Sequence, residues 1–269
     1  MKIEHVLEKG SGSVNEDTLV IEKNLFGVFD GATSIDQAIL GNSKTGGMIA
    51  SSAACSVFSK NHYPLLDLAR TANREIFNKM IIHGVDFTAR ERLWSTSAAV
   101  VRINEGGIEW VQAGDSYIIV IYKDNTYKVF TEKDDHDYET LTQWKLMAKY
   151  CSESIREALS DQIKKVRLEM NRSYGVLNGE KEAEQFFRSG VEPLDNIKKI
   201  LLFTDGLHIP EKIPEKRKNF DRFVENYLSL GLMKLKDLVR KVENEDPDCK
   251  TYPRFKRHDD IAAISIIPS

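Results

Sequence analysis

Acidic residues that lie far apart in the chain each stand beside a short apolar run. Asp30 follows the run 25–29, and Asp205 follows the run 200–204. The same pattern holds for Asp17, Asp115 and Asp259. A carboxylate at the end of a strand is held rigidly and can still contact water. If these strand ends converge, their oxygen atoms form a site that suits hard divalent cations, and the sequence predicts a metal-dependent hydrolase.

Hydrolysis of a phosphate ester by a metal pair needs several carboxylates around a concave floor. The cations polarise a phosphoryl oxygen and generate hydroxide from bound water near neutral pH. Magnesium and manganese prefer octahedral oxygen sites and keep several waters, so a few protein ligands per ion suffice. Glycine follows both Asp30 and Asp205. Because glycine permits unusual backbone angles, its own carbonyl can approach a metal.

Composition limits the classes of protein that the chain can represent. Its 269 residues are enough for one large domain or two small ones. The formal net charge of −3 gives no basic field for nucleic acid. No apolar run has the length of a membrane span or of a signal-peptide core. The three cysteines, Cys55, Cys151 and Cys249, form neither a zinc spacing nor a disulfide framework, so we expect a cytoplasmic protein without a membrane segment.

Periodicity predicts the elements that must position the acids. Residues 18–22 and 25–29 indicate a tight hairpin, and helices are expected over about 43–60 and 65–83. The second helix should bury one stripe of residues at helical spacing, namely Leu65, Leu68, Ala69, Ala72, Ile76 and Met80. Four β-rich segments with short connections then predict an antiparallel meander over 96–103, 107–112, 117–123 and 126–130.

The second half of the chain mixes polar segments with a few clear elements. The expected helices are 138–150, 154–167, 217–230 and 232–244, and the expected strands are 199–204 and 261–267. Acidic positions near both chain ends suggest that both ends build one site, so we expect a single domain over 1–269, with a flap or insert within 131–196. Helices and strands are segregated along the chain, which favours two sheets packed face to face with helices outside.

The acidic positions belong to longer motifs, and together these motifs resemble the metal-dependent protein phosphatases of the type 2C class, the PPM family, as a divergent member of bacterial type. The motifs occur in the order of that family: Asn15-Glu16-Asp17, Val28-Phe29-Asp30-Gly31, Ser95-Thr96-Ser97-Ala98-Ala99, Gly114-Asp115-Ser116, Phe130-Thr131-Glu132-Lys133-Asp134-Asp135-His136, Phe203-Thr204-Asp205-Gly206-Leu207 and Asp259-Asp260-Ile261. The resemblance implies an α+β fold, a four-layer α-β-β-α sandwich of two antiparallel sheets.

The resemblance also implies metal ligands position by position. Asp30 matches the residue that bridges two metals, and the carbonyl of Gly31 matches a ligand of one of them. Asp205 and Asp259 match ligands of the other metal, although an alignment slip of one residue would exchange Asp259 with Asp260. The water between the two metals would attack the phosphate ester in line. The cofactor would be two Mn²⁺ or Mg²⁺ ions.

Three further acids have less direct roles in the family. Asp17 matches a residue that reaches the metals partly through water, and we assign catalytic roles to Asp17, Asp30 and Asp205. Glu16 matches a position that is acidic in only some members. Asp115 matches a residue that joins a third, weaker metal site, whereas on the residues alone it is better read as a turn residue.

The chain departs from the family pattern around the phosphate. Ala32 stands where many members have a histidine that acts as general acid, Tyr117 stands where an arginine is usual, and residues 10–14 lack the arginine that grips the phosphate. Metal-bound water or one of three histidines, His136, His208 or His258, could supply the missing proton.

The function that these motifs predict is a metal-dependent serine/threonine phosphatase that hydrolyses phosphate monoesters of phosphorylated proteins, as a monomer. Because Ala32, Tyr117 and residues 10–14 depart from the family pattern around the phosphate, an alternative is a weak or inactive regulatory module that binds metal. A two-metal nuclease is a third hypothesis, which the charge balance disfavours.

Overall fold

The computed structural model describes residues 1–35, 44–131 and 135–268. In these residues the strands form two five-stranded antiparallel sheets. The first sheet contains, in spatial order, Lys2–Glu8 (β1), Ile261–Ile267 (β10), Ile197–Phe203 (β9), Tyr117–Tyr122 (β6) and Tyr127–Val129 (β7). The second contains Thr18–Glu22 (β2), Leu25–Gly31 (β3), Thr96–Asn104 (β4), Gly107–Ala113 (β5) and Arg188–Glu192 (β8).

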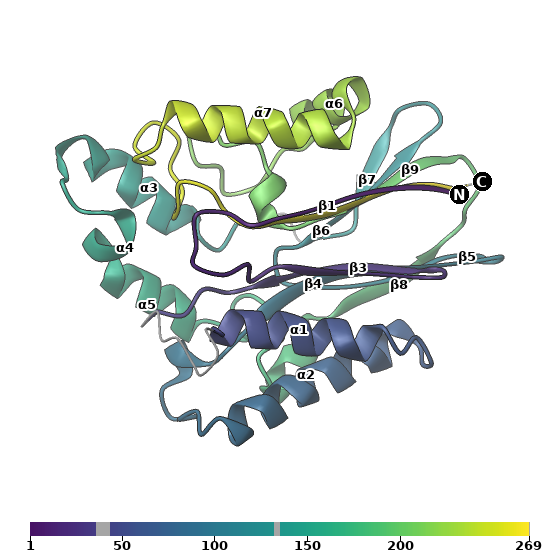
Figure 1. The fold of residues 1–269 in the computed structure, drawn as a ribbon, viewed down its shortest axis with the longest axis horizontal. Coiled ribbons are helices and arrows are strands. Elements are labelled where there is room, and N and C mark those ends of the chain that lie inside the picture. The colour runs from purple at the N-terminus through teal and green to yellow at the C-terminus, as the bar shows by residue number, and fades with distance from the viewer. Residues whose placement is uncertain (36–43, 132–134, 269) are drawn as a thin grey trace.

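Helices cover both outer faces of the paired sheets (Figure 1). Gly46–Phe58 (α1) and Leu65–Ile82 (α2) lie on the second sheet, and Asp221–Leu230 (α6) and Leu232–Glu245 (α7) lie on the first. The predicted four-layer α-β-β-α sandwich is therefore confirmed. A further group lies along one end of the sheets and contains Tyr138–Met147 (α3), Ile155–Ala158 (α4) and Ser160–Leu168 (α5). Short 3-10 helices occupy Arg90–Arg92, Ala148–Tyr150, Lys181–Phe186 and Asp205–Leu207.

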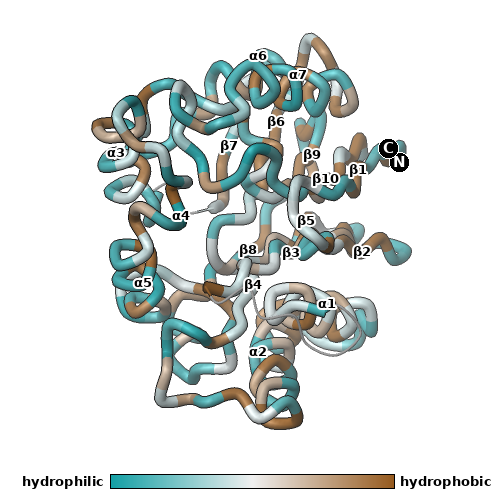
Figure 2. Tube along the Cα trace, turned by 60° about the vertical axis from the view of Figure 1, so that its left-hand side comes forward, coloured by the Kyte–Doolittle hydropathy of each residue, from teal (hydrophilic) through white to brown (hydrophobic). Residues whose placement is uncertain are grey.

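The pattern of buried residues explains why the central strands are apolar at nearly every position. In β3, Phe26 and Val28 belong to the core between the sheets, whereas Leu25 and Phe29 belong to the core under α1 and α2. Because successive side chains point to opposite faces, a strand covered on both sides has no position for a polar residue. The stripe predicted for α2 is buried in full, and Figure 2 shows hydrophobic and hydrophilic residues alternating along this helix.

The predicted four-stranded meander is wrong at its centre. The strands β4 and β5 pair with each other, as do β6 and β7, but β5 and β6 lie in different sheets. The chain crosses between the sheets at Gly114, Asp115 and Ser116. Gly114 has a φ of +80°, and a Cβ there would lie only 2.6 Å from the Cβ of Ser97. This crossing needs glycine and carries Asp115 to the end of the sandwich.

Several element boundaries also differ from those expected. The expected first residue of α1, Ser43, lies outside the described residues, and the helix begins at Gly46 after a Thr45 cap. The helix predicted over 154–167 is split into α4 and α5 at Leu159. The edge strands β1 and β8 were not predicted. An edge strand has one partner and can stay largely exposed, so it carries little apolar signal.

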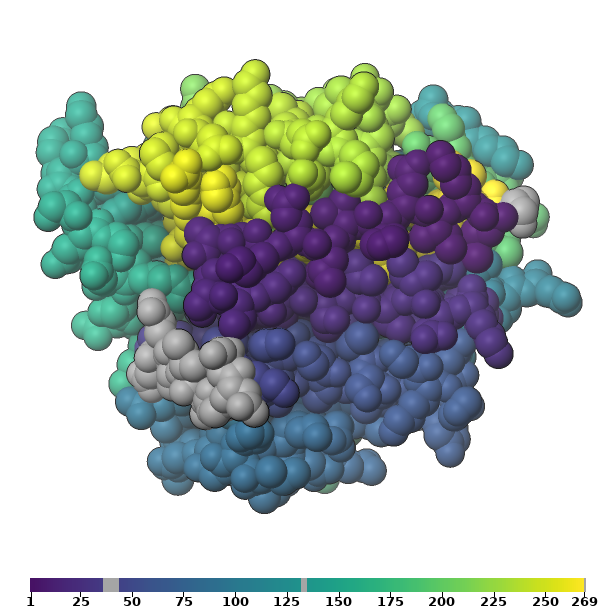
Figure 3. Space-filling view, in the orientation of Figure 1, coloured from purple at the N-terminus to yellow at the C-terminus, as the bar shows by residue number. Residues whose placement is uncertain are grey.

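The two ends of the chain lie side by side in the first sheet. The strand β1 pairs along its whole length with β10, and Figure 3 shows the N-terminal segment as a purple band between the C-terminal helices and the layer of α1 and α2. The loops that follow β1 and precede β10 therefore meet at one end of the sheets. In the described residues, no helix is both long and apolar enough to cross a membrane.

Candidate metal centre

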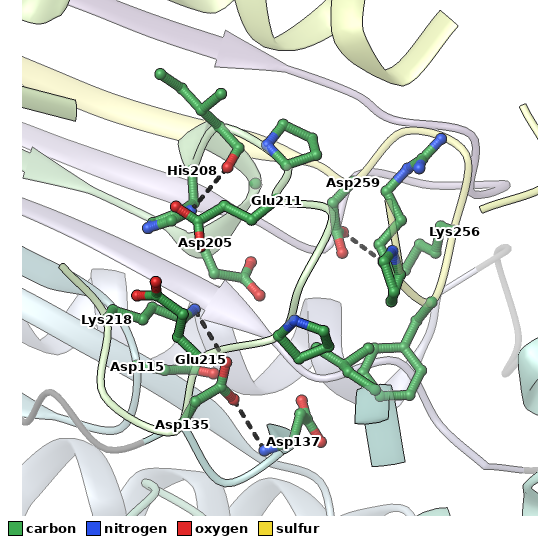
Figure 4. A pocket seen from close by; sticks show the side chains of 18 of the residues that line it. Asp115, Asp135, Asp137, Asp205, His208, Glu211, Glu215, Lys218, Lys256 and Asp259 are labelled. Carbon is green, nitrogen blue, oxygen red and sulfur yellow. Dashed lines mark hydrogen bonds and ion pairs between the residues drawn. The ribbon is translucent and has the colours of Figure 1, made fainter. Parts of the chain in front are cut away.

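The acids predicted from the sequence gather at one end of the sandwich. Asp30 lies near the end of β3, Asp205 begins the 3-10 helix after β9, and Asp259 precedes β10. These three residues line a single cavity together with Gly31 and Asp115. Asp115, Asp205 and Asp259 also line a neighbouring pocket, and Figure 4 shows Asp205 and Asp259 on different sides of it. The fold thus brings together strand ends that are far apart in the sequence.

Backbone contacts hold Asp30 and Gly31 in place. Asp30 pairs with Ser97 across β4, and the Thr96 hydroxyl donates a 2.7 Å hydrogen bond to the Asp30 carbonyl. Gly31 donates its N–H to the carbonyl of Glu16 at 3.2 Å. A Cβ on Gly31 would lie 2.6 Å from that carbonyl oxygen, so a larger residue would push the loop before β2 away.

Burial and mutual repulsion disfavour ionisation of the central acids. Burial, followed by the carboxylates of Asp17 and Asp205, raises the pKa of Asp30 well above its usual range. Burial and then the Asp259 carboxylate raise the pKa of Asp205 to about 7. Carboxylates this close cannot all ionise unless cations offset their charge.

Asp17 lies close to the same cluster and is 7% exposed, but it does not line the cavity. Its carboxylate accepts a 2.7 Å hydrogen bond from the Thr204 hydroxyl. Burial raises the pKa of Asp17 well above its usual range, the carboxylates of Asp259, Asp260 and Asp205 raise it further, and Thr204 opposes them. Asp17 therefore interacts with the cluster through its charge, while a neighbouring hydroxyl fixes its orientation.

The neighbours Asp259 and Asp260 point in different directions. Asp259 lines the cavity and accepts a 2.6 Å hydrogen bond from Lys256. Burial alone would raise the pKa of Asp259, but Lys256, together with the N–H of Asp260 and the charge of Arg156, outweighs it and the pKa lies below its usual value. Asp260 instead accepts backbone hydrogen bonds from Gly10 at 2.7 Å and Glu16 at 2.8 Å. Asp260 thus holds the loop between β1 and β2 at two points, while Asp259 faces the cavity.

Glu16 is also a brace. It is 5% exposed, and its carboxylate accepts hydrogen bonds of 2.5 Å from the hydroxyls of Thr33 and Thr45. These contacts join the loop before β2 to the loop after β3 and to the start of α1. Because both carboxylate oxygens already have partners in the protein, Glu16 serves to hold the site together.

The donor set fits hard divalent cations, although the acids are not closed into a cage. Within residues 1–35, 44–131 and 135–268, no three histidine, cysteine, aspartate or glutamate side chains adopt an arrangement that could hold an ion. Two of the acids turn instead toward partners in the protein, Asp17 to Thr204 and Asp259 to Lys256. All the candidate ligand atoms are oxygens, which Mg²⁺ and Mn²⁺ prefer, and repulsion between the carboxylates favours binding of a cation.

The three histidines that could supply a proton occupy different places. His136 lines the cavity with its ring stacked on Tyr174, 4.0 Å between centroids, and its Nε2 is 3.9 Å from Asp115. His208 packs against Phe220 and Phe223. His258 contacts Glu243 on α7 at 2.8 Å. Of the three, only His136 lines the cavity that contains Asp30, whereas His208 lines the neighbouring pocket together with Asp205 and Asp259.

Sequence reasoning missed the basic residues of the cavity. Lys256, Arg156 and Arg167 line it together with the acids. Lys256 is part of a basic segment just before Asp259, and the two arginines lie on a predicted helix, so their charge was visible. Their position was not, because it depends on how the segment between β7 and β8 folds against the sheets.

Comparison with known proteins agrees with this architecture. A family model described as protein phosphatase 2C matches residues 9–235. No curated protein sequence matches the chain. The serine/threonine phosphatase PstP/Ppp of Mycobacterium tuberculosis is 14% identical with a TM-score of 0.60, covering 100% of this chain and 99% of that one.

Two other solved structures are similar. Stp1 of Staphylococcus aureus is 16% identical with a TM-score of 0.57, covering 100% of this chain and 95% of that one. The catalytic domain of PstP in complex with 2 manganese ions is 14% identical with a TM-score of 0.57, covering 98% of this chain and 96% of that one. At such identities these likenesses show the fold alone. Since the family model spans most of its length, the chain belongs to the protein phosphatase 2C family.

Proposed function

We propose that this chain is a metal-dependent phosphatase that hydrolyses phosphate monoesters on serine and threonine residues of phosphorylated proteins. The observation that carries the proposal is the convergence of Asp30, Asp205 and Asp259 on one cavity, where burial and repulsion raise the pKa of Asp30 and Asp205. Family membership and the fold shared with serine/threonine phosphatases support the reaction class.

The residues would divide the work as follows. Asp30, Asp205 and Asp259, with the carbonyl of Gly31, would hold two Mn²⁺ or Mg²⁺ ions, and Asp17 would contact them partly through water. Bound ions of this kind polarise a phosphoryl oxygen and lower the pKa of water. Asp115 would border a third, weaker site. The protein's own contribution is to fix these oxygen atoms on rigid strand ends, so that little rearrangement is needed when ions and substrate bind.

The direct test measures phosphate release from p-nitrophenyl phosphate and from a phosphothreonine peptide with added Mn²⁺. Asp30→Asn and Asp205→Asn should each lower kcat by about a hundred-fold or more, because metal ions contribute several kcal/mol to such reactions. The exposed Asp161→Asn on α5 is the matched control and should behave like the wild type. Activity that survives chelation, or survives both site variants, would contradict the proposed mechanism.

A second candidate function follows from the residues that differ from the family pattern around the phosphate. Ala32, Tyr117 and the arginine-free residues 10–14 remove groups that many family members use. A regulatory module would bind Mn²⁺ in calorimetry and lose that binding in Asp30→Asn, yet release no phosphate from either substrate. The same protein preparations therefore distinguish the two functions.

A further inference from the structure

Two arginines from the segment between β7 and β8 line the cavity that contains the acids. Arg156 lies on α4 and Arg167 on α5, and both border the cavity together with Asp30 and Asp259. Both are partly buried. Each brings a permanent positive charge and five N–H donors to the wall that faces the carboxylates.

Neither arginine is paired with a carboxylate in the described part of the chain. Arg167 donates one hydrogen bond, from Nη2 to the carbonyl of Thr33. Burial lowers the pKa of Arg167, although Tyr174 and, more weakly, Asp137 and Glu16 oppose this. Arg156 has no hydrogen bond or ion pair with any described residue. No nitrogen of either guanidinium is among the fully buried atoms without a partner, so the unused donors remain accessible to a ligand in the cavity.

Other partly buried arginines in this chain are fully engaged, which makes this pair unusual. Arg90 binds both oxygens of Glu180, at 2.7 and 3.0 Å, and two backbone carbonyls. Arg254 contacts Asp246 at 3.0 Å and further carbonyls. The protein therefore satisfies arginines that serve structure, whereas Arg156 and Arg167 keep most of their donors free of described protein partners.

We propose that Arg156 and Arg167 together bind the phosphate group of the substrate in this cavity. The inference rests on the proposed function, because the substrate of a phosphatase carries the phosphate group that the two arginines would bind. A guanidinium matches two phosphate oxygens at once, which a lysine cannot do. The pair would also take the place of the arginines that this sequence lacks within residues 10–14 and at Tyr117. The clamp would thus come from the segment between β7 and β8, which borders the same cavity as the strand ends that carry the acids.

An alternative explanation is that the arginines only offset the charge of the acids. Asp259 already has a cationic partner in Lys256 at 2.6 Å, and Arg156 contributes less to Asp259 than Lys256 does. If charge balance were the whole role, loss of the arginines would change the affinity for Mg²⁺ and leave the affinity for phosphate unchanged. The experiment must therefore measure both.

The test uses the full chain with Arg156→Ala, Arg167→Ala and the double variant. Calorimetry measures the binding of Mg²⁺ alone and of inorganic phosphate in the presence of Mg²⁺, and kinetics measure kcat and KM for p-nitrophenyl phosphate. We expect each single variant to weaken phosphate binding and raise KM by about ten- to a hundred-fold, as for loss of a charged hydrogen bond. Arg156→Lys and Arg167→Lys should bind phosphate more tightly than the alanine variants but less tightly than the wild type. Lysine keeps the positive charge but lacks the planar guanidinium that donates two parallel hydrogen bonds.

Arg172→Ala is the matched control, because Arg172 follows α5, is exposed and does not line the cavity. It should leave phosphate affinity unchanged. Thermal unfolding shows whether the loss of the Thr33 contact in Arg167→Ala affects folding. The Arg156→Ala variant loses no hydrogen bond to a described residue, so it tests the proposal without that complication.

The outcomes separate this inference from the proposed function. An active wild type whose KM and phosphate affinity are unchanged in the double variant overturns the clamp and leaves the phosphatase standing. An inactive wild type overturns the phosphatase. Phosphate binding by that inactive protein would then support the clamp if it depends on the two arginines, and overturn it if it does not, or if phosphate does not bind.

Discussion

The hydroxyl of Thr204 donates a 2.7 Å hydrogen bond to Asp17, a residue from the opposite half of the chain. The same oxygen accepts a 2.9 Å hydrogen bond from the N–H of Ala262. One buried side chain therefore joins the end of β9, the start of β10 and the loop before β2. These are the segments that carry Asp205, Asp259 and Asp17, so Thr204 helps to hold the acids together.

Thr204→Val should destabilise the protein by about 1–3 kcal/mol, because it keeps the shape of the side chain and leaves buried polar groups without a partner. Urea unfolding at pH 7.5 measures the effect. Thr204→Ser keeps the hydroxyl and is the control, with a smaller loss expected from one missing methyl group. Equal stability of the valine variant and the wild type would show that the contact does not stabilise the fold.

The neighbours Asp259 and Asp260 should respond to substitution in opposite ways. Asp260→Ala removes the acceptor of two backbone hydrogen bonds from Gly10 and Glu16, so it should cost about 3 kcal/mol or more of folding free energy. Asp259→Asn removes a charge that repels Asp17 and Asp205 but pairs with Lys256, so these two effects oppose each other and the metal-free protein should lose less stability than Asp260→Ala does, while Mn²⁺ affinity falls. Thermal unfolding in EDTA and calorimetry with Mn²⁺ measure the two effects. The reverse pattern would exchange the roles of these residues.

The metal-free protein should become more stable relative to Asp205→Asn as the pH falls from 7.5 to 5.5. The folded-state pKa of Asp205 is raised to about 7, so the folded protein holds a proton that the unfolded chain releases near pH 4. That contribution is lost as the pH rises toward 7. His208 acts in the opposite direction, since its pKa is lowered, and comparison with the Asp205 variant cancels its effect.

The measurement is the unfolding free energy in EDTA at both pH values, followed by the same titration with Mn²⁺. Protons and cations compete for the carboxylates, so the stabilisation by Mn²⁺ should be larger at pH 7.5 than at pH 5.5. A difference between wild type and variant that does not change with pH would mean that Asp205 ionises normally in the folded protein.

The parts of the fold that could be predicted from sequence are those with a strong local signal. The run 25–29 and the strand Ile261–Ile267 are buried on both faces, and their uninterrupted apolar character identified them. The edge strand Arg188–Glu192 has no buried residue and gave no such signal. The crossing at Gly114 was missed for a different reason, because short connections look alike whether the next strand joins the same sheet or the facing one.

The candidate site likewise contains residues that a local sequence pattern identifies and residues that it does not. The acids could be identified from sequence because each stands beside an apolar run, and the structure places Asp30, Asp205 and Asp259 around one cavity. The bracing role of Glu16 depends on Thr33 and Thr45, whose approach is a property of the folded loops. Contacts of this kind join residues across many positions of the chain, and no local pattern encodes them.

His208 should be replaceable by phenylalanine with a gain in stability that grows as the pH falls. Burial, followed by the charge of Lys218, lowers the pKa of His208 to about 3, and its Nε2 has no partner in the described residues. The unfolded chain binds a proton at this position below about pH 6.5, which the folded protein cannot do, so the histidine weakens the fold in acid. Removing it should gain about 1–2 kcal/mol at pH 5 and less at pH 7.5.

The measurement compares urea unfolding of the wild type and His208→Phe at the two pH values, with the exposed His62→Phe as the control. The control should show no such dependence, because the His62 side chain is exposed in the folded protein. A histidine that stays neutral down to about pH 3 has no proton to give near neutral pH, which disfavours His208 as general acid. A stability difference independent of pH would mean that His208 is protonated in the folded protein, and it would reopen that role.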